Sequence, residues 1–391
     1  MTEKSFFTRA VHAGENRKEN HGALSVPIYT ASVFAFSDAD EGAAIHNYRK
    51  EGYFYGRLGN PTQTALEKAV AELESGEDAL AFASGMAAVA AAILTIVKTG
   101  DHIVAPESMY STTTLFLNEL AEKFGIETTF IDATDARNYA AAARENTKIF
   151  WIESPSNPLL NITDFSTVVE ISKENSITTI ADNTFATPFN QQPLTHGVDL
   201  VVHSATKYLG GHSDLTAGLL VGRKDLIEKA RLHTTKLYGG NIAPQVAWLV
   251  LRGIKTLALR MERHNQNAYA VANMLANHPK VKAVYHPSLQ NHKNHDVARR
   301  QMNGFGGMIS FDVGSVEAGK ILVNNLEICA LATSLGGVET IVQHSVSMTH
   351  ATLSPEERLK AGVTDGLIRL SVGIEDAQDL IRDLENALAK I

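Results

Sequence analysis

A repeated alternation of short apolar runs and longer helical stretches between residues 63 and 222 most constrains the fold of this chain. Most of the apolar runs are continuous, which is typical of strands buried on both faces. They cover residues 79–83, 102–105, 128–132, 149–153, 178–181, 199–203 and 218–222. Amphipathic segments, such as residues 64–75 and 85–98, lie between them. The pattern predicts an α/β fold with a mainly parallel sheet covered by helices.

The segment before this pattern, residues 1–62, is rich in Gly, Pro and Tyr and has little periodicity. It predicts an N-terminal arm that needs another surface to lie on. Asn60-Pro61 is a turn signal, and Thr64 with Glu67 has the spacing of a capping box. A helix is therefore expected to begin near residue 63, at the start of a large domain that covers residues 63–250.

The segment after the pattern predicts a smaller C-terminal α/β domain at residues 251–391. A long helical passage covers residues 247–278 and is closed by Pro279. The strand-like and helical runs that follow it are residues 280–286, 306–313, 315–326, 367–373 and 376–390.

Charge and composition exclude several classes of partner. The net charge is −8 and no run is dense in Lys or Arg, which argues against nucleic acid. No apolar run is long enough to cross a bilayer, and the N-terminal sequence lacks the pattern of a secretory signal, so we expect no membrane contact and a cytoplasmic protein. The single cysteine, Cys329, forms no internal disulfide and offers no zinc cluster, so no metal is expected.

Polar residues follow several of the predicted strands, where ligands bind in open α/β sheets. They are residues 84–86, 107–110, 153–157, 182–184 and 204–207. Each group alone is an ordinary cap or turn. Together they offer a helix N-terminus for a phosphate, a carboxylate for a protonated pyridine nitrogen and an amine that can form an imine.

Eight longer stretches carry a resemblance to a known family. They are SVPIYTASVF (25–34), YGRLGNPT (55–62), FASGMAA (82–88), ESPSNP (153–158), ADNTFATP (181–188), HSATKYLGGHSD (203–214), SLGGVE (334–339) and IRLSVGIED (368–376). On these stretches the chain resembles the Cys/Met-metabolism, or transsulfuration, enzymes that depend on pyridoxal phosphate. The resemblance implies the PLP-dependent transferase-like fold, also called fold type I or aminotransferase-like, and a homotetramer built as a dimer of dimers.

The resemblance also implies how the cofactor, pyridoxal 5′-phosphate, is held. Lys207 would form the imine with it, and Asp182 would pair with its pyridine nitrogen. The ring of Tyr110 would stack on it. Its phosphate would be bound by two backbone amides, two hydroxyls and a pair from a neighbouring subunit, which are Gly85, Met86, Ser204, Thr206, Tyr55 and Arg57.

On the substrate side, the resemblance implies that Arg369 binds the carboxylate of an amino acid through its planar fork. Asn157 and Ser334 would lie in the same pocket, while Thr112 and Glu339 stand where family members differ in reaction choice. Lys207 would remove the α-proton.

The reaction itself has two candidates. Thr112 stands where methionine γ-lyases usually carry Cys, and Leu115 where cystathionine-processing members often carry Arg. Glu339 is similar to that of cystathionine γ-lyases and γ-synthases, and residues 343–350 resemble methionine γ-lyases. YGR at residues 55–57 also occurs in plant-type cystathionine γ-synthases. We expect a carbon–sulfur lyase that performs γ-elimination on methionine or cystathionine. The alternative is a γ-replacement synthase, either a cystathionine γ-synthase or an O-acylhomoserine sulfhydrylase.

Other classes fit the sequence less well. Residues 204–207 match the S-x-x-K of serine β-lactamases and residues 98–100 a K-T-G, but their order along the chain is wrong. Two histidine pairs, His292 with His295 and His203 with His212, lack a matching carboxylate and third ligand for a metal. A non-catalytic cofactor-binding protein is a third alternative, which release of ammonia from amino acids would exclude.

Overall fold

The computed structural model describes residues 4–348, 358 and 362–391, and it contains two sheets. The larger has seven strands in the order β1-β7-β6-β5-β4-β2-β3. Their bounds are β1 (Asp78–Phe82), β2 (His102–Pro106), β3 (Glu127–Ile131), β4 (Thr147–Glu153), β5 (Thr178–Asp182), β6 (Leu200–Ser204) and β7 (Gly218–Gly222). Each predicted run overlaps one of these strands. Neighbouring strands are parallel from β6 to β3, whereas β7 is antiparallel to both β1 and β6.

Both faces of this sheet are buried, which explains the continuous apolar runs. Along β4, Ile149 and Trp151 belong to the core under α4 (Gly85–Leu94) and α5 (Ser111–Phe124). Phe150 and Ile152, between and after them, belong to the core on the opposite face under α7 (Phe165–Glu174). Successive side chains of a strand point to opposite faces, so a strand covered on both sides is apolar throughout.

Two helix ends differ from the prediction. Helix α3 (Pro61–Glu74) begins two residues earlier, because the Asn60 side chain caps it by accepting from the amide of Thr62. The predicted capping box is wrong, since Glu67 accepts instead from the amide of Ala81. Helix α4 ends at Leu94 rather than near residue 98. The chain turns there because the carboxylate of Asp101 accepts from the amide of Lys98.

The predicted long helical passage divides into α11 (Pro244–Ile254) and α12 (Leu257–Ala276). In a continuous helix, the carbonyl of Gly253 would accept from the amide of Leu257. The guanidinium of Arg260 donates to that carbonyl at 2.7 Å and also to the carbonyl of Tyr208. Arg260 therefore satisfies the carbonyl that the break leaves free, and it connects α12 to the loop after β6.

The smaller sheet has five strands in the order β10-β11-β12-β9-β8. Their bounds are β8 (Ala283–Tyr285), β9 (Met308–Asp312), β10 (Ala330–Leu331), β11 (Ile341–His344) and β12 (Leu367–Ser371). Three lie within predicted runs, whereas β10 and β11 were not predicted. Helices α12, α14 (Val316–Asn324) and α16 (Ala377–Leu388) enclose its core, which contains the single cysteine, Cys329. Cys329 is buried, and its backbone amide donates to the carboxylate of Asp383.

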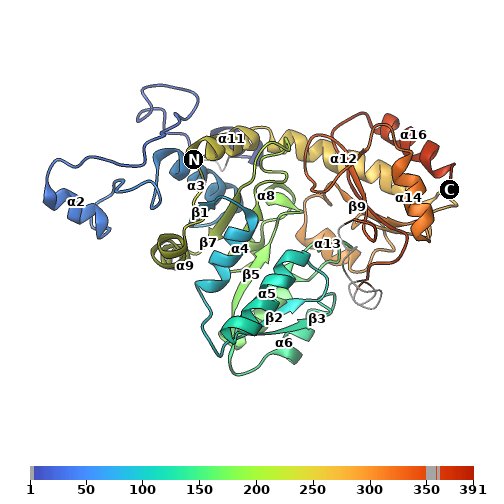
Figure 1. Cartoon of the computed structure of the whole chain (residues 1–391), viewed down its shortest axis with the longest axis horizontal. Helices are drawn as coiled ribbons and strands as arrows, with labels where there is room; N and C mark the ends of the chain where they lie inside the picture. The colour runs from blue at the N-terminus through green and yellow to red at the C-terminus, as the bar shows by residue number, and fades with distance from the viewer. Residues whose placement is uncertain (1–3, 349–357, 359–361) are drawn as a thin grey trace.

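The N-terminal residues divide into two parts. Helix α1 (Phe6–His12) packs on the body, where the ring centroids of Phe6 and Phe189 lie 5.3 Å apart and Ala10 is buried. The chain that follows, with helix α2 (Ala39–His46), extends away from the body at the left of Figure 1. Leu24 and Val33 in this part are each 70% exposed, so the described residues of the chain do not cover these apolar side chains.

Several short helices lie in the described part of the chain. They are α6 (Asn138–Ala142), α8 (Thr187–Asn190), α9 (Lys224–Ala230), α10 (Lys236–Tyr238), α13 (His295–Gln301), a 3-10 turn at Pro193–His196 and a π-helical turn at Arg231–Thr235. Among the described helices, none combines the length and apolarity that a membrane span requires.

Candidate active site

A cavity of about 390 Å³ lies at the carboxyl ends of β4, β5 and β6. It is lined by residues of the large sheet and by residues of the small-sheet domain. Ten predicted site residues line it together: Gly85, Met86, Tyr110, Asn157, Asp182, Ser204, Thr206, Lys207, Ser334 and Arg369.

Lys207 follows β6 and directs its amine into this cavity. Its Nζ donates to Oγ of Ser334 at 2.6 Å. Burial, and to a smaller extent the positive charge of Arg369, lower the pKa of Lys207 to about 8. A lysine with a lowered pKa is neutral more often near pH 7, so its amine is a better nucleophile and base.

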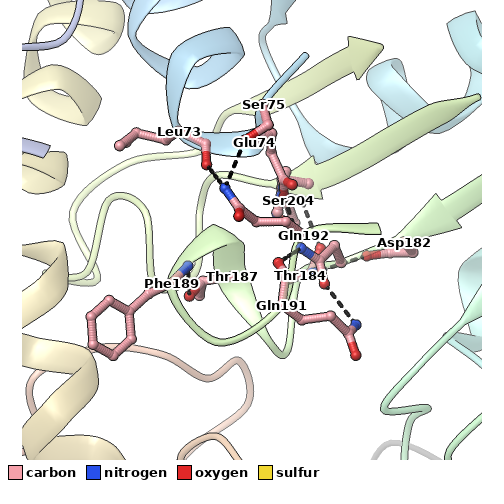
Figure 2. Close-up of polar contacts among 12 residues, drawn as sticks. Leu73, Glu74, Ser75, Asp182, Thr184, Thr187, Phe189, Gln191, Gln192 and Ser204 are labelled. Carbon is pink, nitrogen blue, oxygen red and sulfur yellow. Dashed lines mark hydrogen bonds and ion pairs between the residues drawn. The ribbon is translucent and has the colours of Figure 1, made fainter. Parts of the chain in front are cut away.

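Asp182 is the last residue of β5. Its Oδ1 accepts from the amide of Thr184 at 2.9 Å, and the Thr184 hydroxyl accepts from the amide of Ser204 at 2.8 Å (Figure 2). Burial raises the pKa of Asp182, opposed by the Thr184 hydrogen bonds and by His203. The Nε2 atom of His203 lies 2.5 Å from the buried carboxylate of Glu74. A carboxylate whose pKa is raised by burial, as that of Asp182 is, requires a cationic partner to stay ionised.

The first turn of α4 and the end of β6 lie side by side and could hold an anion. The Ser84 side chain caps α4 by accepting from the amide of Ala87, which leaves the amides of Gly85 and Met86 for a ligand. A Cβ added to Gly85 would lie 2.8 Å from Cβ of Ser204, so only glycine allows this approach. The hydroxyl of Thr206 bonds the backbone of Ala217.

Arg369 lies inside β12 and is buried. Its Nη1 donates to Oδ1 of Asn157 at 2.8 Å. Its Nη2 donates to the carbonyl of Ser334 at 3.0 Å and to Oε1 of Gln343 at 3.2 Å. Burial lowers the pKa of Arg369 to about 10. These three acceptors are uncharged, so the guanidinium keeps a positive charge to offer an anionic ligand.

Comparisons with known proteins agree with this geometry. The profile described as Cys/Met metabolism PLP-dependent enzyme matches residues 7–389. The chain belongs to this family. It is 46% identical to an L-methionine gamma-lyase of Fusobacterium nucleatum over 100% of both chains. It is 47% identical to a cystathionine gamma-lyase of Bacillus subtilis over 98% of this chain and 99% of that one.

A solved structure gives the same result for the fold. A cystathionine gamma synthase from Xanthomonas oryzae pv. oryzae, in complex with cystathionine, has a TM-score of 0.94 and 41% identity, and covers 100% of this chain and 99% of that one. The fold type I prediction is confirmed, and so is the dependence on pyridoxal phosphate.

The residues of this family member fit that cofactor. The cavity holds a buried amine, a carboxylate at a strand end and a helix N-terminus at Gly85, where a Cβ would meet the Ser204 side chain. Lys207 would hold its aldehyde carbon, Asp182 its ring nitrogen, and the amides of Gly85 and Met86 its phosphate. When bound, the cofactor supplies an electron sink for charge that develops on the substrate.

Four predicted residues lie outside the lining of this cavity. Arg57 donates to the carbonyl of Lys236, and its guanidinium lies 5.7 Å from the ring centroid of Tyr55. Thr112 lies in the first turn of α5, beside the lining residue Ser111. Glu339 is exposed and adjoins the loop at Gly337. Contact of Tyr55 and Arg57 with a neighbouring subunit stays a prediction.

The lining residues that had no role in the sequence interpretation include Glu153, Thr184 and Gln343. Glu153 and Thr184 belong to the polar groups that follow strands. Their position at a strand end was the sequence feature that could have marked them as site residues. Gln343 lies inside the unpredicted strand β11. The sequence gives no signal for it beyond the resemblance of residues 343–350, of which residues 349 and 350 lie outside the described residues.

The rival interpretations have no support in the site. The Lys207 amine donates to Ser334, and residues 98–100 do not line the cavity. Within the described ranges, no group of three or more His, Cys, Asp or Glu could hold a metal ion. The imidazole of His295 contacts the carbonyl of Pro287.

Proposed function

We propose that this enzyme is a carbon–sulfur lyase that performs γ-elimination on methionine or cystathionine and releases a 2-oxo acid, ammonia and a thiol. The observation that carries the proposal is one cavity that contains a buried amine and a buried guanidinium, Lys207 and Arg369. Elimination from an amino acid requires a base near the α-carbon and a cation that binds the carboxylate. Relatives named as lyases support elimination as the reaction.

Arg369 would bind the substrate carboxylate through its guanidinium fork. Asn157 and Gln343 accept from it and fix the plane of that fork. The orientation matters because a misplaced carboxylate moves the α-hydrogen away from the base.

Lys207 would take the α-proton, release it again to the electron-accepting system that the cofactor supplies, and then, as a neutral amine, take a proton from the β-carbon. The Ser334 hydroxyl accepts from its Nζ, which fixes the amine in the cavity. Tyr110 lies at the mouth, where its ring is 44% exposed, and would protonate the departing sulfur. Asp182 would hold the proton on the ring nitrogen.

The assembly is part of the proposal. We propose a homotetramer, built as a dimer of dimers, in which Tyr55 and Arg57 reach the phosphate site of a neighbouring subunit. The exposed apolar side chains after α1 support a partner surface. Mixing Arg57→Ala with Lys207→Ala protein tests it, since activity returns only if each site uses both chains. The cytoplasmic location is proposed from the sequence alone.

A γ-replacement synthase is the second candidate, favoured by the similarity to a cystathionine gamma synthase. One assay separates the two. Purified enzyme is incubated with methionine, cystathionine, cysteine, or O-acetylhomoserine, with and without a thiol. We expect 2-oxo acid and ammonia without added thiol, and a strict thiol requirement would overturn the lyase proposal.

A further inference from the structure

Glu153 is a second buried carboxylate at the edge of the large sheet. It is the last residue of β4, is 4% exposed and lines the cavity. It is the register partner of Asp182 on the neighbouring parallel strand. Burial, and to a smaller extent the charge of Asp182, raise the pKa of Glu153 to about 8. A carboxyl group in such a position is costly to ionise, so its presence there requires an explanation.

Its two oxygens accept from two different loops. Oε2 accepts from the amide of Tyr110 at 2.9 Å, and Oε1 accepts from the amide of Asn157 at 2.8 Å. Tyr110 is the residue that precedes α5, and Asn157 lies in the loop after β4. One side chain therefore fixes the backbone of both loops.

Both loops carry groups of the site. The ring of Tyr110 lies at the cavity mouth, and Oδ1 of Asn157 accepts from Nη1 of Arg369 at 2.8 Å. We propose that Glu153 is a positioning residue that holds Tyr110 and Asn157, and through Asn157 the Arg369 fork, in the geometry that binds the substrate. The inference rests on the proposed function, because it assigns Arg369 to the substrate carboxylate.

The chemistry of the two oxygens makes the inference testable. Both oxygens of Glu153 accept from backbone amides, and an oxygen keeps acceptor capacity whether or not the carboxyl group is protonated, whereas the side-chain nitrogen of glutamine only donates. Glu153→Gln keeps the size of the side chain but places an N–H group against one backbone N–H group. One loop must then shift, and the fork loses its alignment.

The test uses the full-length holoenzyme and norleucine, which has the length of methionine but no sulfur to release. Its dissociation constant is measured from the visible absorbance of the bound cofactor, beside KM and kcat for elimination. We expect Glu153→Gln to raise the dissociation constant of norleucine and the KM by about tenfold each. Glu145→Gln is the matched control, because it removes an exposed carboxylate just before the opposite end of β4. Wild-type values for Glu153→Gln would overturn the inference.

A double-mutant cycle separates positioning from general destabilisation. In an Asn157→Ala background, Glu153→Gln should raise the dissociation constant by less than threefold, because the route to Arg369 is already lost. A tenfold effect in both backgrounds would overturn the route through Asn157.

If Glu153→Gln does not fold, Glu153→Asp decides, because the shorter carboxylate cannot reach both amides. A wild-type dissociation constant for Glu153→Asp would overturn the inference. Failure of the proposed function would look different, since the wild-type enzyme would then release no 2-oxo acid while norleucine binding still reported on Glu153.

Discussion

The edge of the large sheet and the interior of the small sheet contribute to the same cavity in different ways. On the large sheet, Glu153, Asp182 and Ser204 are the final residues of three neighbouring parallel strands. On the small sheet, Gln343 and Arg369 face each other within antiparallel strands. Parallel strands gather their last residues at one edge, whereas antiparallel strands offer side chains from a face. The proposed cofactor side is thus built from strand ends and the proposed substrate side from strand interiors.

Lys207→Ala should have the largest effect and tests the large-sheet side. Without the amine, neither the covalent tether nor the base is present, and we expect kcat to fall by about 10³-fold or more. The measurement is 2-oxo acid release, with Lys229→Ala on the surface helix α9 as control. Turnover near the wild-type level would place the base elsewhere.

Arg369→Ala tests the small-sheet side. Loss of a buried charged hydrogen-bonding group should raise KM by about 100-fold, and Arg369→Lys should recover only part because it lacks the planar fork. Cofactor retention after dialysis should match the wild type. Arg382→Ala is the control, because it removes an exposed arginine. Cofactor loss with an unchanged KM would contradict the division between the two sheets.

Gly85→Ala sharpens the comparison at the proposed phosphate site. The added methyl group would lie 2.8 Å from Cβ of Ser204. This overpacking should cost about 1–3 kcal/mol of binding free energy and raise the Kd of the cofactor roughly 20-fold. In Gly59→Ala, the nearest side-chain atom would be 3.7 Å away, in the Tyr53 ring, so that variant should bind normally. Equal affinity in both variants would contradict a phosphate site at this helix.

The pH dependence of cofactor capture is the smallest expected effect. Burial lowers the pKa of Lys207 to about 8, so the amine is protonated below that pH and neutral above it. Only the neutral amine adds to an aldehyde. The capture rate of cofactor-free protein should therefore be about tenfold lower at pH 7 than on its plateau. Rapid mixing, with an α-blocked lysine to correct for titration of the aldehyde, measures it. A rate still rising at about pH 10 would indicate an ordinary lysine.

The same comparison explains which parts of the molecule the sequence could predict. The strands of the large sheet are apolar on both faces, as Phe150 and Trp151 illustrate, so they are recognisable without any relative. Strand β11 was missed because half of it is polar. Its His344 is buried, and its two ring nitrogens bond the hydroxyl of Ser347 and the carbonyl of Asp365. No local sequence pattern reveals these partners.

The site residues also differ in how well the sequence predicts them. Asp182 and Lys207 follow strands and could be proposed from position alone. Arg369 stands between apolar residues of a strand, and only the family resemblance distinguished it from any other arginine. The two amides that donate to Glu153 lie 43 residues before it and four residues after it. A hydrogen bond across 43 residues can be recognised only in the folded chain.

The burial of Cys329 has a consequence for an enzyme that releases thiols. Only a thiolate attacks a disulfide, and an oxidised product would otherwise form mixed disulfides with any accessible protein sulfur. Burial raises the pKa of Cys329 well above its ordinary value, and the neighbouring Asp383 raises it further. The single sulfhydryl of the chain is thus protonated and shielded from solvent, so we expect it to stay unmodified when a thiol is released nearby.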